Sequence, residues 1–396
     1  MSTHSRRLAR LSTLAALALL APSDSAAQGL PWGLGAGFGY ETYDFADADA
    51  VGMERLSLWT VPLVAHLEPA RWLDLDVDGA YAEGELVRPD GSTSTISGFT
   101  DTELRATIPI RSGSTSLSLT GVAILPTGLE SQAEGEVAVA GVIAADLLPL
   151  RISNWGGGGG YALSAAAAHA FGTVNLGVSA GYRVASEFEP LGAGVFAFRP
   201  GNELRVRVAA DRNVRGKSKA SIHATLFTYS EDELNGANLY TSGNRVQVVG
   251  SLAFPLGAAS SAVTYAGVLH RAQGTVIDPL RTGEITTAAD LPSQQLFLFG
   301  TGGRVPLGRH RLLPVADVRV FRRDDGLGQG YVLGFGSSAE VRLTGVSSDF
   351  TAYAGSGIVL VPSFNVRFGR LLARDDAESN FSGVDLGVGI RFGGGR

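Results

Sequence analysis

The stretch that decides the fold reads Gly383-Val384-Asp385-Leu386-Gly387-Val388-Gly389-Ile390-Arg391-Phe392. Successive side chains of an extended strand point to opposite faces. Five apolar side chains therefore share one face, while the other face carries two charges between glycines. A strand of a soluble β-sandwich can show this alternation, but it also fits a strand with lipid on one side and a polar lumen on the other. Repetition elsewhere in the chain has to decide between the two.

The same alternation recurs through the 396 residues. Apolar residues alternate with aspartates in Leu73–Tyr81 and with arginines in Leu204–Ala210. Ile96–Ile108 and Tyr331–Leu343 have the same period, and helical periodicity does not appear over a useful length. The sequence therefore predicts an all-β fold, an antiparallel transmembrane up-and-down β-barrel of about 18 strands, with about 14–16 as alternatives.

Weaker strand candidates complete this count, among them Val137–Leu148 and Leu191–Phe198. Phe350–Phe368 is taken as one overlong strand. The count also predicts that long connections lie at one end of the barrel and short turns at the other. The segment Pro149–Gly160, with its run of five glycines, fits poorly as a short turn in this scheme.

The N-terminus has the organisation of a secretory signal peptide. Three arginines precede the apolar run Leu11–Ala21, and Ser25-Ala26-Ala27 offers a small-residue cleavage site. We expect residues 1–27 to be removed and residues 28–396 to form a single barrel domain. Removal of three arginines and Asp24 changes the formal net charge from −6 to −8. Only Gln28–Gly33 would then precede the first strand, which predicts no N-terminal plug domain.

Composition excludes several classes of protein. The absence of cysteine excludes disulfides, thiolate metal sites and a cysteine nucleophile. The only lysines are Lys217 and Lys219, so the acidic chain has no basic stripe for nucleic acid. After the N-terminus, no apolar stretch is long enough for a membrane helix.

Charged residues of both signs occupy the polar faces of the predicted strands. An arginine opposite a carboxylate on a neighbouring strand keeps such charges satisfied, and a ring of both signs can tune solute preference in a water-filled pore. The predicted lumen-lining residues are Asp74, Asp76, Asp78, Asp101, Glu103, Arg105, Glu203, Arg205, Arg207, Asp317, Arg319, Glu340, Arg342, Arg367, Asp385 and Arg391.

Two motifs match functional patterns in the wrong context. Asp74, Asp76, Asp78, Gly79 and Glu85 have the spacing of an EF-hand loop, but that motif requires flanking helices. Gly177-Val178-Ser179-Ala180-Gly181 matches a nucleophile elbow without the helix that should follow. Ser221 and His223 share a face, but the sequence assigns no third triad member. We therefore predict no enzyme activity, no metal site and no cofactor.

Two short stretches resemble known outer-membrane proteins. Asp385, Gly387, Ile390 and Phe392 resemble the C-terminal β-signal by which barrels are recognised for assembly, although four residues follow Phe392 here. Ile124-Leu125-Pro126-Thr127-Gly128 resembles a turn of barrels associated with the phenol-degradation meta pathway, which implies transport of aromatic compounds. The many inward charges argue against a hydrophobic conduit, so the substrate class stays open.

Together these features predict a porin-like channel in the outer membrane of a Gram-negative cell, through which small solutes pass passively. The alternatives are a structural or surface-interaction barrel with a closed lumen and, less favoured, a barrel hydrolase. The expected partners are outer-membrane lipid and lipopolysaccharide, the barrel-assembly machinery and small solutes, with no nucleic acid. The sequence leaves the oligomeric state open.

Overall fold

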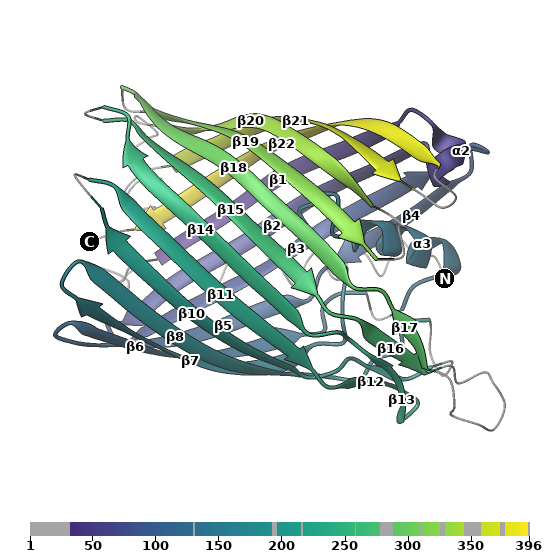
Figure 1. Ribbon diagram of the computed structural model, residues 1–396, viewed down its shortest axis with the longest axis horizontal. Helices are drawn as coiled ribbons and strands as arrows, with labels where there is room; N and C mark the ends of the chain where they lie inside the picture. Colours follow the sequence, from purple (N-terminus) through teal and green to yellow (C-terminus); the bar gives the residue numbers. More distant parts are fainter. Residues whose placement is uncertain are drawn as a thin grey trace, which may run out of the picture.

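The computed structural model describes residues 32–129, 131–191, 196–214, 217–257, 259–277, 288–308, 310–324, 329–343, 358–372 and 377–394. The predicted signal peptide and the first part of the predicted strand Phe350–Phe368 lie outside these residues. Within them the chain forms one closed antiparallel sheet, in which β1 and β22 pair from Trp32 with Gly394 to Phe45 with Phe381 (Figure 1). This closure confirms the predicted fold class.

The barrel wall has 16 strands. The segments β4 and β5 count as one wall strand, because both pair with β3. Only Thr100 and Asp101 lie between the two segments. The wall segments in order are β1 (Trp32–Phe45), β2 (Arg55–Ala70), β3 (Leu73–Val87), β4 (Thr93–Phe99), β5 (Thr102–Ser112), β6 (Thr115–Leu125), β7 (Gly160–Phe171), β8 (Val174–Ala185), β10 (Glu203–Asn213), β11 (Lys219–Tyr229), β14 (Arg245–Pro255), β15 (Ser261–Arg271), β18 (Gln294–Leu307), β19 (His310–Arg323), β20 (Gln329–Leu343), β21 (Ile358–Leu372) and β22 (Glu378–Gly394).

Two predicted strands are absent from the wall, which accounts for the difference from about 18 strands. The segment Val137–Leu148 contributes to the helix α3 (Glu134–Ile143) instead. The segment Leu191–Phe198 contributes only Phe198 to the short strand β9 (Phe198–Arg199). Because both segments are absent, the number of wall strands stays even. Only β7 and β8, which lie between the two absent segments in the sequence, run opposite to the direction that a count of 18 implies.

The outer face of the wall is apolar. Leu386 and Val388 on β22 are 44% and 46% exposed, and Leu204 and Val208 on β10 have the same outward parity. An aromatic row crosses the outside of the first strands, where ring pairs 5.2–6.3 Å apart join Phe38, Trp59, Tyr81 and Phe99. Apolar bands with aromatic girdles are typical of transmembrane barrels. None of the described helices has the length and apolar character to cross a membrane.

The two ends of the barrel differ, as the sequence predicts. Short turns join β2 to β3, β5 to β6 and β7 to β8 at the end where the C-terminus lies (Figure 1). Longer connections lie at the other end, here called the long-loop end. They contain α2 (Ala48–Val51), α3 and a separate sheet of β9, β12 (Glu231–Leu234), β13 (Ala237–Thr241), β16 (Gly274–Ile277) and β17 (Ala288–Leu291).

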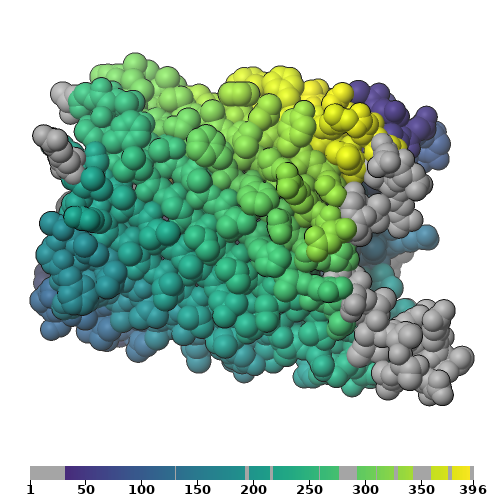
Figure 2. Space-filling view, viewed as in Figure 1, coloured from purple at the N-terminus to yellow at the C-terminus, as the bar shows by residue number. Residues whose placement is uncertain are grey.

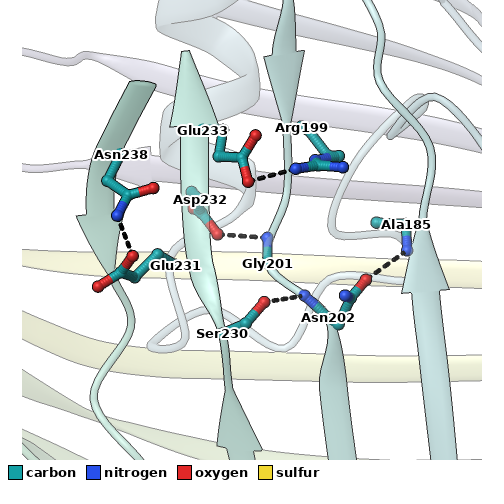
Figure 3. A network of polar contacts seen from close by, with 9 residues as sticks. All are labelled: Ala185, Arg199, Gly201, Asn202, Ser230, Glu231, Asp232, Glu233 and Asn238. Atoms are coloured by element: carbon teal, nitrogen blue, oxygen red, sulfur yellow. Dashed lines mark hydrogen bonds and ion pairs between the residues drawn. The ribbon is translucent and has the colours of Figure 1, made fainter. Parts of the chain in front are cut away.

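Polar contacts attach the separate sheet to the wall beside β10 (Figure 3). The backbone N–H of Gly201 donates to Asp232 at 2.6 Å, and that of Asn202 donates to Ser230 at 2.8 Å. Arg199 and Glu233 form an ion pair between β9 and β12. These contacts fix the rim of the long-loop end above β8 to β11.

The described residues between β6 and β7, 126–129 and 131–159, fold into the barrel; we call them the inner segment. Its helix residues Val139 and Ile143 belong to one buried cluster with Leu56 of β2, Leu296 of β18 and Phe381 of β22. Side chains from such separate parts of a closed wall can meet only inside it. The cluster therefore identifies the interior face of each strand, and the wall covers it on the side seen in Figure 2.

Candidate functional site: the barrel interior

Arg151 holds the inner segment to the wall. Its backbone N–H donates to Glu41 of β1 at 3.0 Å, and its guanidinium donates to Asp385 of β22 at 2.5 Å. The side chain of Asn365 donates to the other oxygen of Asp385 at 2.8 Å. Both carboxylates are buried, since Glu41 is 1% and Asp385 6% exposed. A buried carboxylate needs such charge-assisted partners, so Arg151 is tied to a defined place.

Three further hydrogen bonds fix the inner segment near β3 and β5. Asp101 accepts hydrogen bonds from the backbone N–H groups of Gly128, at 3.1 Å, and Gly157, at 2.8 Å. The indole N–H of Trp155 donates to the carbonyl oxygen of Ala82 at 3.0 Å, and Trp155 is fully buried. Asp101 therefore clamps both ends of the segment, whereas the sequence predicted it only as a lumen charge.

Glycine makes room for this arrangement at two places. A Cβ atom at Gly39 would lie 2.6 Å from Nε of Arg151, so any larger residue on β1 would displace the guanidinium. Gly159 lies where the inner segment returns to the wall, with φ of 81°, and a Cβ there would be 2.6 Å from the carbonyl oxygen of Ile124. Left-handed backbone and close approach both require glycine. They account for part of the five-glycine run that the sequence left unexplained.

The inner segment covers only part of the interior. It packs on β1 to β4 and on β18 to β22. On the remaining arc, interior side chains are open to water: Arg205 of β10 is 57% exposed and Lys219 of β11 is 50% exposed. Arg105 on β5 is 46% exposed beside Glu103 at 3.3 Å. An enclosed, wetted arc lined by charge thus runs beside the inner segment.

The structure places the predicted lumen residues as follows. Asp74, Asp76 and Asp78 lie on the interior face of β3, Glu103 and Arg105 on β5, Glu203, Arg205 and Arg207 on β10, Asp317 and Arg319 on β19, Glu340 on β20, Arg367 on β21, and Asp385 and Arg391 on β22. Asp101 lies between β4 and β5. Arg342 lies on β20 at a position whose side chain is outside the described part of the structure.

Some of these residues form ion pairs. Arg205 contacts Glu203 at 2.7 Å, and Arg367 approaches Asp317 at 3.7 Å. Other predicted residues contact groups that the sequence did not single out: Asp76 pairs with His66 at 2.8 Å and Glu340 with Arg311 at 3.1 Å. The interior charges are therefore partly neutralised in the wall, as expected for groups that face a water-filled space.

The enzyme-like and metal-like motifs take ordinary strand positions. Asp74, Asp76 and Asp78 follow one another along β3, and Glu85 lies on the opposite face of that strand. Within the described residues no group of three or more histidine or acidic side chains is arranged to hold a metal ion. Ser179 lies in the middle of β8, and the hydroxyl of Ser221 pairs with Ser251 at 2.7 Å.

Several interior residues were not predicted from the sequence. Glu41, Arg151 and Trp155 are the main ones. Glu41 had a detectable signal, because it is the only charge on the interior face of β1. Arg151 and Trp155 lie in an irregular segment, where no periodicity indicates a face.

The predicted assembly-signal residues lie on β22, the closing strand. Asp385 and Gly387 have the interior parity, and Ile390 and Phe392 have the outward parity. The strand continues to Gly394, two residues beyond Phe392. Because Asp385 also binds Arg151, this position has a second structural role in the folded barrel.

Comparisons with known proteins give similarity of fold only. No protein-family model and no curated protein matches the chain, so the β-signal and meta-pathway resemblances stay predictions. An outer membrane channel from Pseudomonas putida F1 is 15% identical over 63% of this chain and 91% of that chain, with a TM-score of 0.39. A bacterial polysaccharide outer membrane secretin is 10% identical over 90% and 97%, with a TM-score of 0.43. A triple mutant of the Rhodopseudomonas blastica porin is 12% identical over 91% and 99%, with a TM-score of 0.33.

The class of protein is defined by the wall itself. It is a closed antiparallel β-barrel of 16 strands with an apolar outer face and a charged, partly wetted interior. This is the architecture of channel-like outer-membrane barrels.

Proposed function

We propose that the protein is an outer-membrane channel through which small polar solutes pass passively, beside the inner segment. The observation that carries the proposal is the wetted charged arc. Arg205, Lys219 and Arg105 are each 46–57% exposed although they point into a closed wall. Barrels of this size leave an aqueous channel when their interior is not filled.

The inner segment gives this channel its width and its shape. The apolar cluster around Val139, Ile143 and Trp155 removes one side of the lumen from water. The part of the lumen that stays open to water lies between the inner segment and strands β5 to β14. A narrowed lumen with charges on its wall favours the passage of small hydrated solutes over that of large or hydrophobic ones.

The outer membrane of a Gram-negative cell is the proposed location, with the long-loop end outside. The apolar outer face would contact lipid and lipopolysaccharide, and the barrel-assembly machinery would insert the chain through β22. Long connections outside and short turns inside are the usual asymmetry of such barrels. Fractionation of cells into soluble and outer-membrane material tests this location.

The second candidate is a structural or surface-interaction barrel with a closed lumen. The buried cluster favours it, because 16 hydrophobic side chains seal part of the interior, among them Tyr43 and Phe45 near the long-loop end. The described part of the connection Gln273–Ser293 does not seal the lumen, because its strands β16 and β17 belong to the separate sheet at the rim.

Solute-dependent swelling of liposomes separates the two candidates. Liposomes containing the purified protein should swell in small sugars and amino acids, at rates that fall steeply with solute size. Ala209 and Ala210 provide a matched pair, since they are neighbours on β10 with interior and outward parity. Ala209→Trp should slow the entry of the larger solutes, whereas Ala210→Trp should leave all rates unchanged. Swelling equal to that of empty liposomes would favour the closed barrel.

A further inference from the structure

Arginine is concentrated in one cross-strand row of the interior. Direct register partners connect Arg205 to Phe227, Phe227 to Arg245 and Arg245 to Arg271. The row continues from Arg271 to Gln294 and from Gln294 to Arg323. Six neighbouring wall strands thus present four guanidinium groups along one line of register partners, and we call Arg205, Arg245, Arg271 and Arg323 the arginine row.

The middle of this row is short of negative charge. Arg245 and Arg271 are direct neighbours on paired strands, where like charges destabilise each other. Arg245 lies over the ring of Tyr229 at 5.5 Å, and its Nε atom has no hydrogen-bond partner among the described residues. Arg271 donates to the hydroxyls of Tyr240, at 2.5 Å, and Ser242, at 2.9 Å. Neutral hydroxyls orient a guanidinium but leave its charge uncompensated.

Two carboxylates near this row, Glu203 and Asp232, have other hydrogen-bond partners. Glu203 is bonded to Arg205 at 2.7 Å. Asp232 accepts the backbone N–H of Gly201 at 2.6 Å. Burial raises the pKa of Asp232, against the lowering effects of Gly201 and Arg271. Asp232 attracts Arg271 electrostatically, but Arg245 is a like-charged neighbour of Arg271, so an anion from solution would add a second compensating charge.

The end of the row opens into a cavity between α3 and the wall. The cavity has a volume of about 480 Å³, within the range of small-molecule sites. Arg271, Gln294 and Arg323 supply most of its polar side, and Asp146 also lies in its lining, so two arginines face one carboxylate there. Its remaining surface is mainly apolar: Phe45, Met53, Val137, Val142, Leu147 and Phe321. A few convergent polar groups above an apolar floor are the usual composition of a ligand pocket.

We propose that this cavity binds a small organic anion, a carboxylate with a short apolar tail. Arg271 and Arg323 hold the carboxylate, with Gln294 as a further donor, and the tail lies against Val142 and Leu147. Arginine is suited to this task because its planar fork matches a carboxylate. Binding at this site does not depend on the proposed channel function. Only its role depends on it, as the entry site for such solutes at the long-loop end.

Equilibrium binding of hexanoate to the purified protein tests this site without any need for conduction. Isothermal titration at neutral pH should show saturable hexanoate binding at millimolar or lower concentration. Arg271→Gln should weaken it at least tenfold, because one charge-assisted contact is lost. Hexan-1-ol has the same tail without the charge, and its weaker binding should be equal in both proteins. Far-UV circular dichroism checks that each variant is folded.

Two more variants keep the test sharp. Arg105→Gln removes an exposed interior arginine on β5, far along the wall from the row, and should leave hexanoate affinity unchanged. Val142→Asp places a negative charge on the apolar floor and should abolish binding. The proposal is overturned if wild type does not bind hexanoate, if Arg271→Gln binds it equally well, or if hexan-1-ol binds as tightly as hexanoate. A binding site without liposome swelling would instead leave the site standing and refute the channel.

Discussion

Replacing Arg151 by alanine should release the inner segment from the wall. The substitution removes the 2.5 Å contact with Asp385 and the weaker approach to Glu41 at 4.0 Å, while the backbone bond to Glu41 can remain. Removing one partner of a buried ion pair costs about 3–5 kcal/mol. Asp385 keeps its bond from Asn365, so we expect the lower end, about 3 kcal/mol. The ratio of released to seated inner segment then rises about 100-fold.

Single-channel recording in planar bilayers measures this release as longer or more frequent visits to a higher conductance level. Arg55→Ala is the control, because its ion pair with Asp44 is exposed on the outward face and such pairs contribute only about 0–1 kcal/mol. In an Asp385→Asn background the effect of Arg151→Ala should shrink, since the partner charge is already absent. If Arg151→Ala leaves the conductance levels and their occupancies as in wild type, the pair with Asp385 does not hold the segment.

Three further predictions concern the segment, the wall and the N-terminus. Trp155→Ala removes a fully buried side chain and its bond to Ala82, so it should destabilise the seated segment by about 3–5 kcal/mol and raise conductance noise. Val208→Lys, on the lipid side of β10, should lower stability in urea by about 2–4 kcal/mol, whereas Ala209→Lys on the interior side should cost less than about 1 kcal/mol; equal losses would contradict the assigned faces. Mass spectrometry of the exported protein should find Gln28 as the first residue, and retention of Arg6 would refute the signal peptide.

Strand faces could be predicted where two real environments alternate along one strand. In Gly383–Phe392 the apolar face meets lipid and the polar face meets the interior, so period 2 is visible in the sequence. The period of Ile96–Ile108 predicts Ile96 on the same outward face as Leu104, and this prediction is wrong. The break at Thr100 and Asp101 changes the parity between β4 and β5, and Ile96 lies in the interior, fully buried.

The inner segment could not be predicted because its apolar side chains are buried against protein inside the barrel, not exposed to lipid. Val137–Leu148 is as apolar as a lipid-facing strand, but it is buried in the interior against other apolar side chains. The sequence does not show whether an apolar side chain contacts lipid or other protein side chains. The interpretation as a wall strand was therefore wrong, and Pro149–Gly160 was assigned to the wrong end of the barrel.

The interior charges were easier to find than their partners. Asp385 stands out in its strand, yet nothing nearby in the sequence indicates Arg151, which is 234 positions away. Contacts between an irregular segment and a wall depend on the path of the chain, which no local pattern encodes. The carboxylate of Asp101 was found for the same reason as Asp385, and its use as a clamp on Gly128 and Gly157 required the structure.

The most direct measurement is the current through purified, refolded wild-type protein in a planar lipid bilayer. A barrel with lipid-facing side chains outside and a wetted, charged arc inside should insert and give discrete current steps that grow with salt concentration. Protein that is folded and membrane-inserted by circular dichroism and flotation, yet carries no current above that of the bare bilayer, would contradict the account.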